Sequence, residues 1–128
     1  FEKTVLLVDD DMRNTFALAK ILRKKGLVVH IAPSGKDALL ALDKHTDIDI
    51  VLMDIMMPEM DGFEAIGHIR AQAVHTNLPV IALTAKAMPG DKEQCLAAGA
   101  NDYLTKPADV QKLLVVMQMW LSKVDNSV

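Results

Sequence analysis

Short apolar runs alternate five times with longer amphipathic segments along the 128-residue chain. The runs consist mainly of Val, Ile and Leu and do not alternate strictly with polar residues. That pattern is typical of parallel strands covered on both faces, whereas a half-exposed antiparallel strand alternates. The predicted strands are Thr4–Val8, Val28–Ile31, Ile48–Met53, Pro79–Leu83 and Asp102–Leu104.

Each run precedes a segment of helical length with apolar residues at helical spacing. Ser34 stands where an N-cap is expected, and Gly26 and Gly99 follow two of the segments as stop signals. Five strand–helix units in one short chain predict an α/β fold, a doubly wound sandwich. Right-handed crossovers favour the flavodoxin-like order 2-1-3-4-5 for its parallel sheet. The predicted helices are Met12–Lys25, Ser34–Leu42, Gly62–Ala71, Met88–Ala98 and Val110–Leu121.

The composition is that of one folded domain, with 51% hydrophobic and 24% charged residues. The net charge of −3 gives no electrostatic basis for nonspecific nucleic-acid binding, so we expect no direct contact with nucleic acid. No apolar run approaches the roughly 18 residues of a membrane span, so we expect no membrane insertion. The single cysteine, Cys95, suits a reducing compartment, and we expect a cytoplasmic location.

Polar residues follow the predicted strands at the edge where a parallel sheet binds its ligand. In such sheets the site lies beyond the carboxyl ends of the strands, where the strand order reverses. Strands one and three are neighbours at that point, so Asp9, Asp10 and Asp54 are expected in one pocket. Thr84 and Lys106 follow strands four and five and are expected on its far side.

Three carboxylates in one pocket repel one another. Two unit charges ~4 Å apart cost on the order of 4 kcal/mol at an effective dielectric constant near 20. Lys106 offers one compensating charge and a divalent ion offers two, and a site of oxygen ligands with room for water suits Mg²⁺. Carboxylates, a hydroxyl, a lysine and Mg²⁺ together predict phosphoryl chemistry with a carboxylate as nucleophile.

A purely structural explanation exists for each of these residues taken alone. Asp9, Asp10 and Asp11 precede a predicted helix and would favour its N-terminus, and Asp54 would begin a turn. One aspartate is enough for a cap, however. The joint placement of the polar residues at several strand ends therefore favours a functional site.

Around these residues the sequence resembles the receiver domain of two-component response regulators, the CheY-like family. The resemblance covers residues 3 to 121 in order and spacing. The segment from Ala82 to Pro107 is most similar to receivers carried by hybrid sensor histidine kinases. The matching stretches are Leu7–Asp11, Met53–Gly62, Leu83–Ala85 and Tyr103–Pro107.

The resemblance implies a role for each site residue. Asp54 would accept a phosphoryl group from the phosphohistidine of a partner, either a histidine kinase or a histidine phosphotransfer protein. Asp10 and Asp54 would bind Mg²⁺ directly, with Mn²⁺ as the alternative ion, and Asp9 would act partly through water. The backbone carbonyl of Met56 would be a further ligand, and Lys106 would pair with phosphoryl oxygens.

The resemblance also implies a switch and catalysis by the receiver itself. Thr84 would move toward the phosphoryl group and Tyr103 would follow it inward, as a population shift between two packings. The altered surface would be that of the fourth helix, the fifth strand and the fifth helix. The receiver would catalyse the transfer and its own dephosphorylation, and Met56 and Lys86 would tune the lifetime of the acyl phosphate.

The partner is expected to contact Arg13, Asn14 and Ala17, which lie near the site on the first predicted helix. We interpret residues 1–128 as a single receiver domain, with a core of residues 3–121 and a tail of residues 122–128. The chain begins with Phe1 rather than Met, so we expect it to be part of a longer protein. One candidate parent is a hybrid histidine kinase bound to a membrane, whose cytoplasmic part would include this receiver. The oligomeric state is left open.

Other classes of protein share parts of this pattern. A phosphatase of the haloacid dehalogenase type needs a second acid two residues after the nucleophile, where this chain has Met56. A flavodoxin-like FMN carrier needs a neutral loop after the first strand, where three aspartates stand here. A pseudo-receiver that binds partners without being phosphorylated is the alternative function.

The four histidines are His30, His45, His68 and His75, and their spacing is not typical of a metal site. We interpret them as residues of the surface or of strand edges. None has the context of a phosphodonor, so autophosphorylation is not expected.

Overall fold

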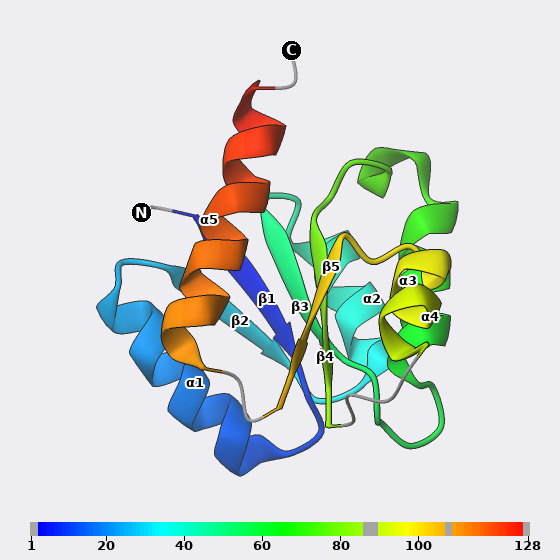
Figure 1. The fold of residues 1–128 in the computed structure, drawn as a ribbon, viewed down its shortest axis with the longest axis horizontal. Helices are drawn as coiled ribbons and strands as arrows, with labels where there is room; N and C mark the ends of the chain where they lie inside the picture. Colours follow the sequence, from blue (N-terminus) through cyan, green and yellow to red (C-terminus); the bar gives the residue numbers. More distant parts are fainter. Residues whose placement is uncertain (1–2, 86–89, 107–108, 127–128) are drawn as a thin grey trace.

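The chain forms a parallel five-stranded sheet with helices on both faces (Figure 1). The computed structural model describes residues 3–85, 90–106 and 109–126. The strand order β2-β1-β3-β4-β5 confirms the predicted doubly wound topology. In chain order the elements are β1 (Thr4–Val8), α1 (Met12–Lys24), β2 (Val28–Ala32), α2 (Gly35–Lys44), β3 (Ile50–Asp54), α3 (Gly62–Ala71), the 3₁₀ helix η1 (Ala73–His75), β4 (Val80–Thr84), α4 (Asp91–Ala98), β5 (Asp102–Thr105) and α5 (Val110–Asn126).

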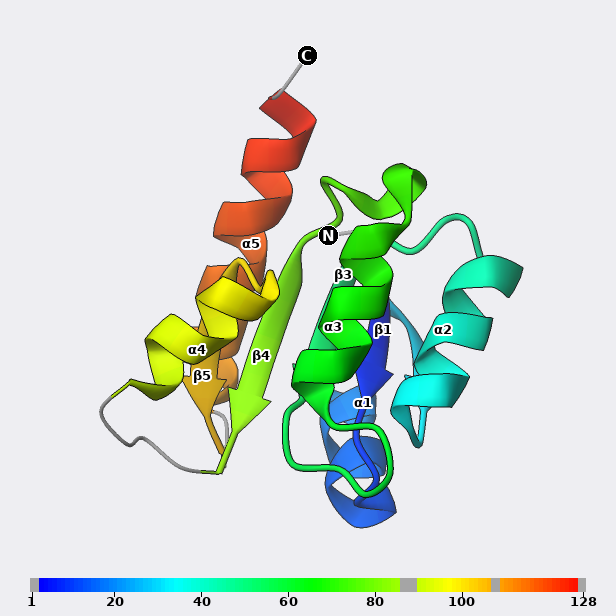
Figure 2. The ribbon, with the colours of Figure 1, turned by 90° about the vertical axis from the view of Figure 1, so that its right-hand side faces the viewer.

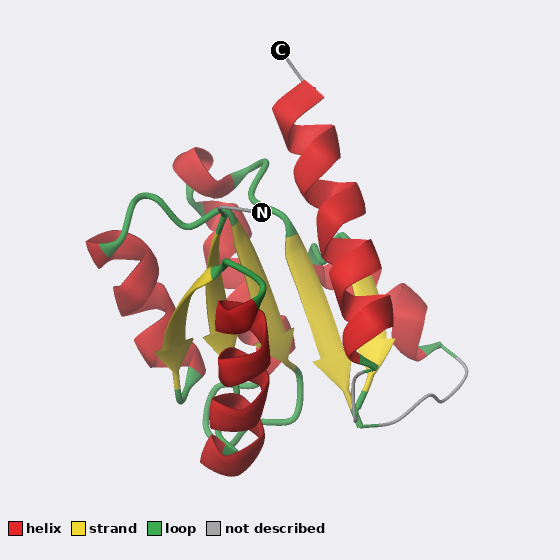
Figure 3. Cartoon of the chain, turned by 90° about the vertical axis from the view of Figure 1, so that its left-hand side faces the viewer, coloured by secondary structure: helices red, strands yellow, loops and turns green. Residues whose placement is uncertain are grey.

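Two hydrophobic layers lie on opposite faces of the sheet. Helices α1 and α5 cover one face and helices α2, α3 and α4 cover the other, as Figures 2 and 3 show from opposite sides. Successive residues of a strand alternate between the layers, so Leu6 and Val8 pack on the α2–α4 side while Val5 and Leu7 pack against α1 and α5. All residues of β1, β3 and β4 are buried, as expected for parallel strands covered on both faces.

Strands β3 and β4 end one residue later than the sequence pattern predicts. They include Asp54 and Thr84 because the ladder of backbone hydrogen bonds continues past both residues. The Ile55 N–H donates to the Leu83 carbonyl (2.9 Å), and the Lys106 N–H donates to the Thr84 carbonyl (2.7 Å). The polar side chains at these two positions are therefore fixed by the sheet rather than by a loop.

Strands β2 and β5 also end one residue later than predicted, β3 and β4 begin two residues and one residue later, and the helices differ as well. Helix α5 continues to Asn126, so residues 122–126 extend it rather than form a tail (Figure 1). Helix α4 begins at Asp91 in the described part of the chain, and the predicted start at Met88 lies outside that part. The pattern also gave no signal for η1. Among the described residues, no helix combines the length and the apolar character needed to cross a membrane.

Trp120 ties α5 to the edge strand β5. Its indole N–H donates to Asp102 Oδ2 (3.2 Å), and the Lys123 Nζ lies 4.4 Å from a ring centroid of Trp120. The ring is partly buried against the apolar layer of α1 and α5. This contact joins the last helix to the strand that carries Tyr103.

Candidate functional site

The carboxyl edge of the sheet brings three aspartates together. Asp9 directly follows β1 and Asp54 ends β3, and these strands are neighbours in which Val8 pairs with Met53. One carboxylate oxygen from each of Asp9, Asp10 and Asp54 lies within 4.8 Å of the other two. Asp9 is 4% exposed and Asp54 2%, whereas Asp10 faces solvent. Two buried carboxylates and one exposed carboxylate therefore share one point of the sheet edge.

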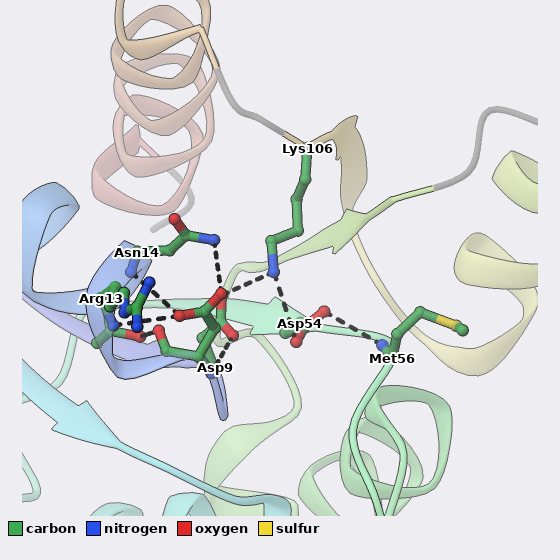
Figure 4. A network of polar contacts seen from close by, with 8 residues as sticks. Asp9, Arg13, Asn14, Asp54, Met56 and Lys106 are labelled. Atoms are coloured by element: carbon green, nitrogen blue, oxygen red, sulfur yellow. Dashed lines mark hydrogen bonds and ion pairs between the residues drawn. The ribbon is translucent and has the colours of Figure 1, made fainter.

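Lys106 reaches this cluster from the end of β5 (Figure 4). Its Nζ lies 2.8 Å from Asp9 Oδ2 and 3.5 Å from Asp54 Oδ2. The hydrogen bond from its backbone N–H to the Thr84 carbonyl fixes the base of the side chain beside β4. A single ammonium group thus faces two buried carboxylates.

This crowding makes ionisation of Asp54 costly. Burial, and after it the charge of Asp9, raises the pKa of Asp54 to about 6, although Lys106 and the Met56 N–H act in the opposite direction. Burial by itself lowers the pKa of Lys106, but the hydrogen bond to Asp9 and the charge of Asp54 outweigh burial and raise that pKa. The site is therefore short of positive charge near neutral pH.

The three consecutive aspartates divide between two tasks. Asp11 is the N-cap of α1, and its Oδ1 accepts hydrogen bonds from the N–H groups of Arg13 (3.1 Å) and Asn14 (3.4 Å). Asp9 Oδ1 accepts a hydrogen bond from the Asp11 N–H (2.9 Å). The capping explanation thus holds for Asp11, whereas Asp9 and Asp10 belong to the carboxylate cluster.

The loop after β3 is shaped around Asp54. The Met56 N–H donates to Asp54 Oδ1 (3.1 Å), while the Met56 side chain is 55% exposed. Gly62 begins α3 so close to the strand that a Cβ on it would lie 2.5 Å from the Asp54 carbonyl oxygen. Glu59 has a φ of 65°, in the left-handed region that residues with a Cβ seldom adopt. A close backbone approach and one strained residue thus accompany the buried carboxylate.

Thr84 and Tyr103 lie on neighbouring strands beside the cluster. Thr84 is 5% exposed and pairs in register with Thr105. Tyr103 pairs with Ala82 and packs, partly buried, against the apolar layer on the α2–α4 side. The proposed inward movement of Tyr103 would therefore begin from a ring that already contacts the core.

The donor set fits Mg²⁺. Carboxylate oxygens and water are the ligands that this ion prefers, and it commonly keeps several of its waters. The exposed Asp10 leaves the cluster open to solvent, and the buried carboxylates carry more negative charge than Lys106 offsets. A dication at this point would relieve the repulsion from Asp9 that, after burial, raises the pKa of Asp54.

The family model of the response regulator receiver domain matches residues 5–118. This chain belongs to that family. The receiver is 41% identical over 116 residues to an uncharacterized 14.6 kDa protein of Leptolyngbya boryana, covering 91% of this chain and 88% of that protein. It is 40% identical over 119 residues to the sensor protein GacS of Pseudomonas syringae pv. syringae, covering 91% of this chain and 13% of GacS.

A solved structure of the same kind is the receiver domain of the sensor histidine kinase PA1611 from Pseudomonas aeruginosa PAO1. It is 38% identical to this receiver with a TM-score of 0.86, and the match covers 95% of this chain and 99% of that one. A magnesium ion is coordinated in the active site cleft of that structure. The structural similarity thus extends over nearly the whole chain.

These matches establish the class of function. Receiver domains of two-component systems accept phosphoryl groups, generally bind Mg²⁺, and pair with histidine kinases or phosphotransfer proteins. The predicted similarity to receivers of hybrid histidine kinases is confirmed. Because the receiver spans only 13% of GacS, the likeness to such kinases concerns this domain alone.

The residues expected to contact a partner border the site. Asn14 and Ala17 line a hollow of about 180 Å³ beside the start of α5, which Lys106 also lines, and Arg13 is exposed nearby on α1. A larger hollow of about 460 Å³ lies at the opposite edge of the sheet, away from the carboxylates. Lys86 lies outside the described residues.

Two of the four histidines lie in contact with each other, which the interpretation of the histidines as residues of the surface or of strand edges did not predict. His30 in β2 and His45 at the end of α2 stack with ring centroids 4.0 Å apart, and Asp47 supplies a third donor atom close by. The sequence gives no signal for this group because the whole of α2 separates the two histidines. His68 is exposed, as predicted.

Proposed function

We propose that this receiver accepts a phosphoryl group on Asp54 from the phosphohistidine of a histidine kinase or a histidine phosphotransfer protein. The observation that carries the proposal is the placement of the buried Asp54 carboxylate against Lys106 and two further aspartates. A carboxylate nucleophile beside an ammonium group and a cation site is what phosphoryl transfer requires.

In the transfer step, a carboxylate oxygen of Asp54 forms a bond to phosphorus while the phosphorus–nitrogen bond of the phosphohistidine breaks. The electron pair of the broken bond stays on the imidazole, which takes up a proton from solvent. The Lys106 ammonium, which contacts Asp9 and Asp54 before transfer, would turn toward the phosphoryl oxygens. The Thr84 hydroxyl would donate a hydrogen bond to one of those oxygens.

Asp10 and Asp54 would hold Mg²⁺ or Mn²⁺ directly, Asp9 would act partly through water, and the Met56 carbonyl would be a further ligand. When bound, the ion supplies positive charge that offsets both the carboxylate repulsion and the charge of the phosphoryl oxygens. The raised pKa of Asp54 supports this part of the proposal, because the same crowding that disfavours the free carboxylate favours a bound dication.

Phosphorylation would then shift the population toward a second packing of the receiver. Thr84 would move toward the phosphoryl group, Tyr103 would follow it inward, and the surface of α4, β5 and α5 would change. Hydrolysis by attack of water on phosphorus would restore the free carboxylate, and the receiver would catalyse this step itself. Met56 and Lys86 would set its rate, and the exposed Met56 side chain next to Asp54 is consistent with control of water access.

The partner would dock beside α1. The hollow lined by Asn14 and Ala17 opens next to Lys106, so a helix seated there would bring a phosphohistidine close to Asp54. Arg13 would extend this contact with a positive charge. We propose that residues 1–128 act as one receiver domain within a longer protein, for which a hybrid histidine kinase is a candidate.

The test is the intact mass of the receiver after incubation with Mg²⁺ and acetyl phosphate. We expect a single labile phosphoryl adduct on the wild type. Asp54→Asn should carry none, and a chelator should prevent the adduct on the wild type. Asp11→Asn is the matched control, because it changes a neighbouring aspartate whose side chain caps α1.

An adduct that persists in Asp54→Asn would place the acceptor elsewhere. The absence of any adduct in a folded wild type, with acetyl phosphate and with a phosphorylated phosphotransfer protein as donors, would favour the pseudo-receiver. Loss of the adduct in Asp11→Asn alone would point to the cap of α1 rather than to the carboxylate cluster.

A further inference from the structure

A second group of potential metal ligands lies on the other side of the fold, at the edge strand β2. His30 pairs in register with Leu6, whose side chain packs on the α2–α4 side, so His30 projects toward the same side. His45 is the C-cap residue of α2, and Asp47 follows in the turn before β3. The three residues thus come from a strand, a helix end and a turn.

The backbone that carries these side chains is well anchored. The His45 N–H donates to the Ala41 carbonyl (2.8 Å) and closes the last turn of α2. Two hydrogen bonds of 2.8 Å join Asp49 to β1, from the Thr4 N–H to Asp49 Oδ2 and from the Asp49 N–H to the Thr4 carbonyl. The turn that presents Asp47 is therefore held on both sides.

The donor atoms are close to the spacing of a metal site. One ligand atom from each of His30, His45 and Asp47 lies within 4.8 Å of the other two. Ligands of a tetrahedral Zn²⁺ with bonds near 2.05 Å lie about 3.3 Å apart. The lone pairs of the two stacked rings lie in nearly parallel planes, so at least one imidazole must rotate out of the stack for both rings to bind one ion. Such a rotation is open to these side chains, since His30 and His45 are only partly buried and Asp47 is exposed.

The electrostatics favour a cation as the missing component. The imidazole rings stack 4.0 Å apart at an interplanar angle of 14°, a geometry in which two imidazolium charges would repel. Burial, and after it the neighbouring His45, lowers the pKa of His30 and so favours the neutral ring, whose lone pair can bind a metal. Asp47 and the negative end of the α2 dipole attract a cation, and the Arg23 guanidinium opposes it from α1.

We propose that His30, His45 and Asp47 form a binding site for a transition-metal dication of the Zn²⁺ type. Two imidazoles and a carboxylate, with water in the fourth position, are a ligand set of zinc sites. The bound ion would link the edge strand β2 to the end of α2. This site is separate from the carboxylate cluster, where only oxygen ligands meet, and does not depend on the proposed phosphoryl transfer.

The test is calorimetric titration of the tag-free receiver with Zn²⁺, in excess Mg²⁺ to occupy the carboxylate cluster. We expect one saturable site on the wild type. His45→Gln and Asp47→Asn should each weaken it by more than about tenfold, because each removes a ligand. His68→Gln and His75→Gln are matched controls that should leave it unchanged. His68 has a carboxylate neighbour of its own, Glu64, at 4.0 Å.

A second measurement keeps the proposal testable without any variant. In NMR spectra of the wild type, Zn²⁺ should shift the imidazole resonances of His30 and His45 and leave those of His68 and His75 in place. Absence of saturable binding would overturn the proposal. So would equal weakening in the control variants, or binding that is lost in Asp54→Asn and kept in His45→Gln.

Discussion

The two edges of the sheet use charged side chains in opposite ways. At the carboxyl edge, Asp9 and Asp54 are buried side by side and share the ammonium group of Lys106. At the amino edge, where the strands begin, Asp49 and Arg70 form hydrogen bonds with backbone groups and with a polar side chain. The two buried carboxylates repel each other, and a bound cation can relieve that repulsion. The hydrogen bonds of Asp49 and Arg70 instead hold loops in place. The repulsion between buried carboxylates thus lies at the edge where chemistry is expected.

Arg70 shows the stabilising arrangement most fully. From α3 it donates to the carbonyls of Leu78 (2.7 Å), Gly99 (2.9 Å) and His75 (2.9 Å) and to Asn101 Oδ1 (2.8 Å). One guanidinium group therefore connects α3 with the segment before β4 and with the turn before β5. Arg70 is partly buried, so the carbonyls that it satisfies would not all regain hydrogen bonds to water if it were removed.

The largest effect is expected for Arg70→Met, which keeps much of the side-chain length and removes the donors. The free energy of unfolding should fall by about 3 kcal/mol, because several partly buried carbonyls lose a charged partner. Urea denaturation measures the change. Arg13→Met, at an exposed position, is the control and should stay within about 0.5 kcal/mol of the wild type. Equal losses of stability in the two variants would contradict the stabilising role of the Arg70 hydrogen bonds at the amino edge.

Gly62→Ala comes next and tests the carboxyl edge. The added Cβ would lie 2.5 Å from the Asp54 carbonyl oxygen and 2.7 Å from the Ile55 Cα, and neither backbone atom can yield easily. We expect a loss of about 2 kcal/mol together with slower phosphorylation by acetyl phosphate. Gly67→Ala, where a Cβ meets nothing within 4 Å in the same helix, should stabilise the protein by about 0.5–1 kcal/mol. The same sign for both variants would contradict this account of Gly62.

Asp54→Asn should stabilise the metal-free protein. The pKa of Asp54 is about 6 in the folded chain against an ordinary value of 3.8, so the unfolded chain loses this proton first. Protonated Asp54 makes its full favourable contribution to the free energy of unfolding below about pH 4. This contribution is lost as the pH rises through about 6. Near pH 8 we expect a gain of about 2 kcal/mol for the variant, and little change at low pH.

Two comparisons sharpen this prediction. Saturating Mg²⁺ should stabilise the wild type more than Asp54→Asn, because the ion relieves the same repulsion. Asp49→Asn, the same substitution at the amino edge, should destabilise the protein, because a charged acceptor of the Thr4 N–H becomes neutral. Thermal denaturation at several pH values measures all three effects. A stabilising Asp49→Asn, or a destabilising Asp54→Asn without metal, would remove the distinction between the edges.

The smallest effect concerns Glu59 in the loop after β3. Its φ of 65° is unfavourable for glutamate but accessible to asparagine. Glu59→Asn should therefore raise the free energy of unfolding by about 0.5 kcal/mol. Glu64→Asn, in the first turn of α3, is a control without this strain and should bring no gain. A loss of stability in Glu59→Asn would show that the strain is compensated by contacts of the Glu59 side chain.

The strands and the meeting of Asp9 and Asp54 could be predicted from the sequence because parallel sheets follow regular rules of construction. The apolar runs identify the strands, and right-handed crossovers place the ends of β1 and β3 next to each other. The convergence of Asp9 and Asp54 follows from these two facts alone. The ends of β3 and β4 lie one residue beyond the predicted ends because Asp54 and Thr84 are polar, yet the backbone ladder includes them.

Two kinds of feature could not be predicted from the sequence: hydrogen bonds to backbone groups, and contacts between residues that are far apart in the sequence. Arg70 binds mainly carbonyl groups, which every residue carries, so its role has no sequence signature. His30 and His45 meet because α2 returns along β2, and their separation in sequence reflects helix length rather than any ligand spacing. The left-handed Glu59 is likewise set by the closure of its loop.

The link between Trp120 and Asp102 gives the receiver an optical reporter of its own. Trp120 is the only tryptophan in the chain, so its fluorescence arises from one place, the junction of α5 with β5. Tyr103 is the next residue after Asp102, and a rearrangement of β5 that moved Asp102 would alter the polarity around the indole. Acetyl phosphate should therefore change the emission of the wild type and leave that of Asp54→Asn unchanged, so that activation can be followed in real time without a label.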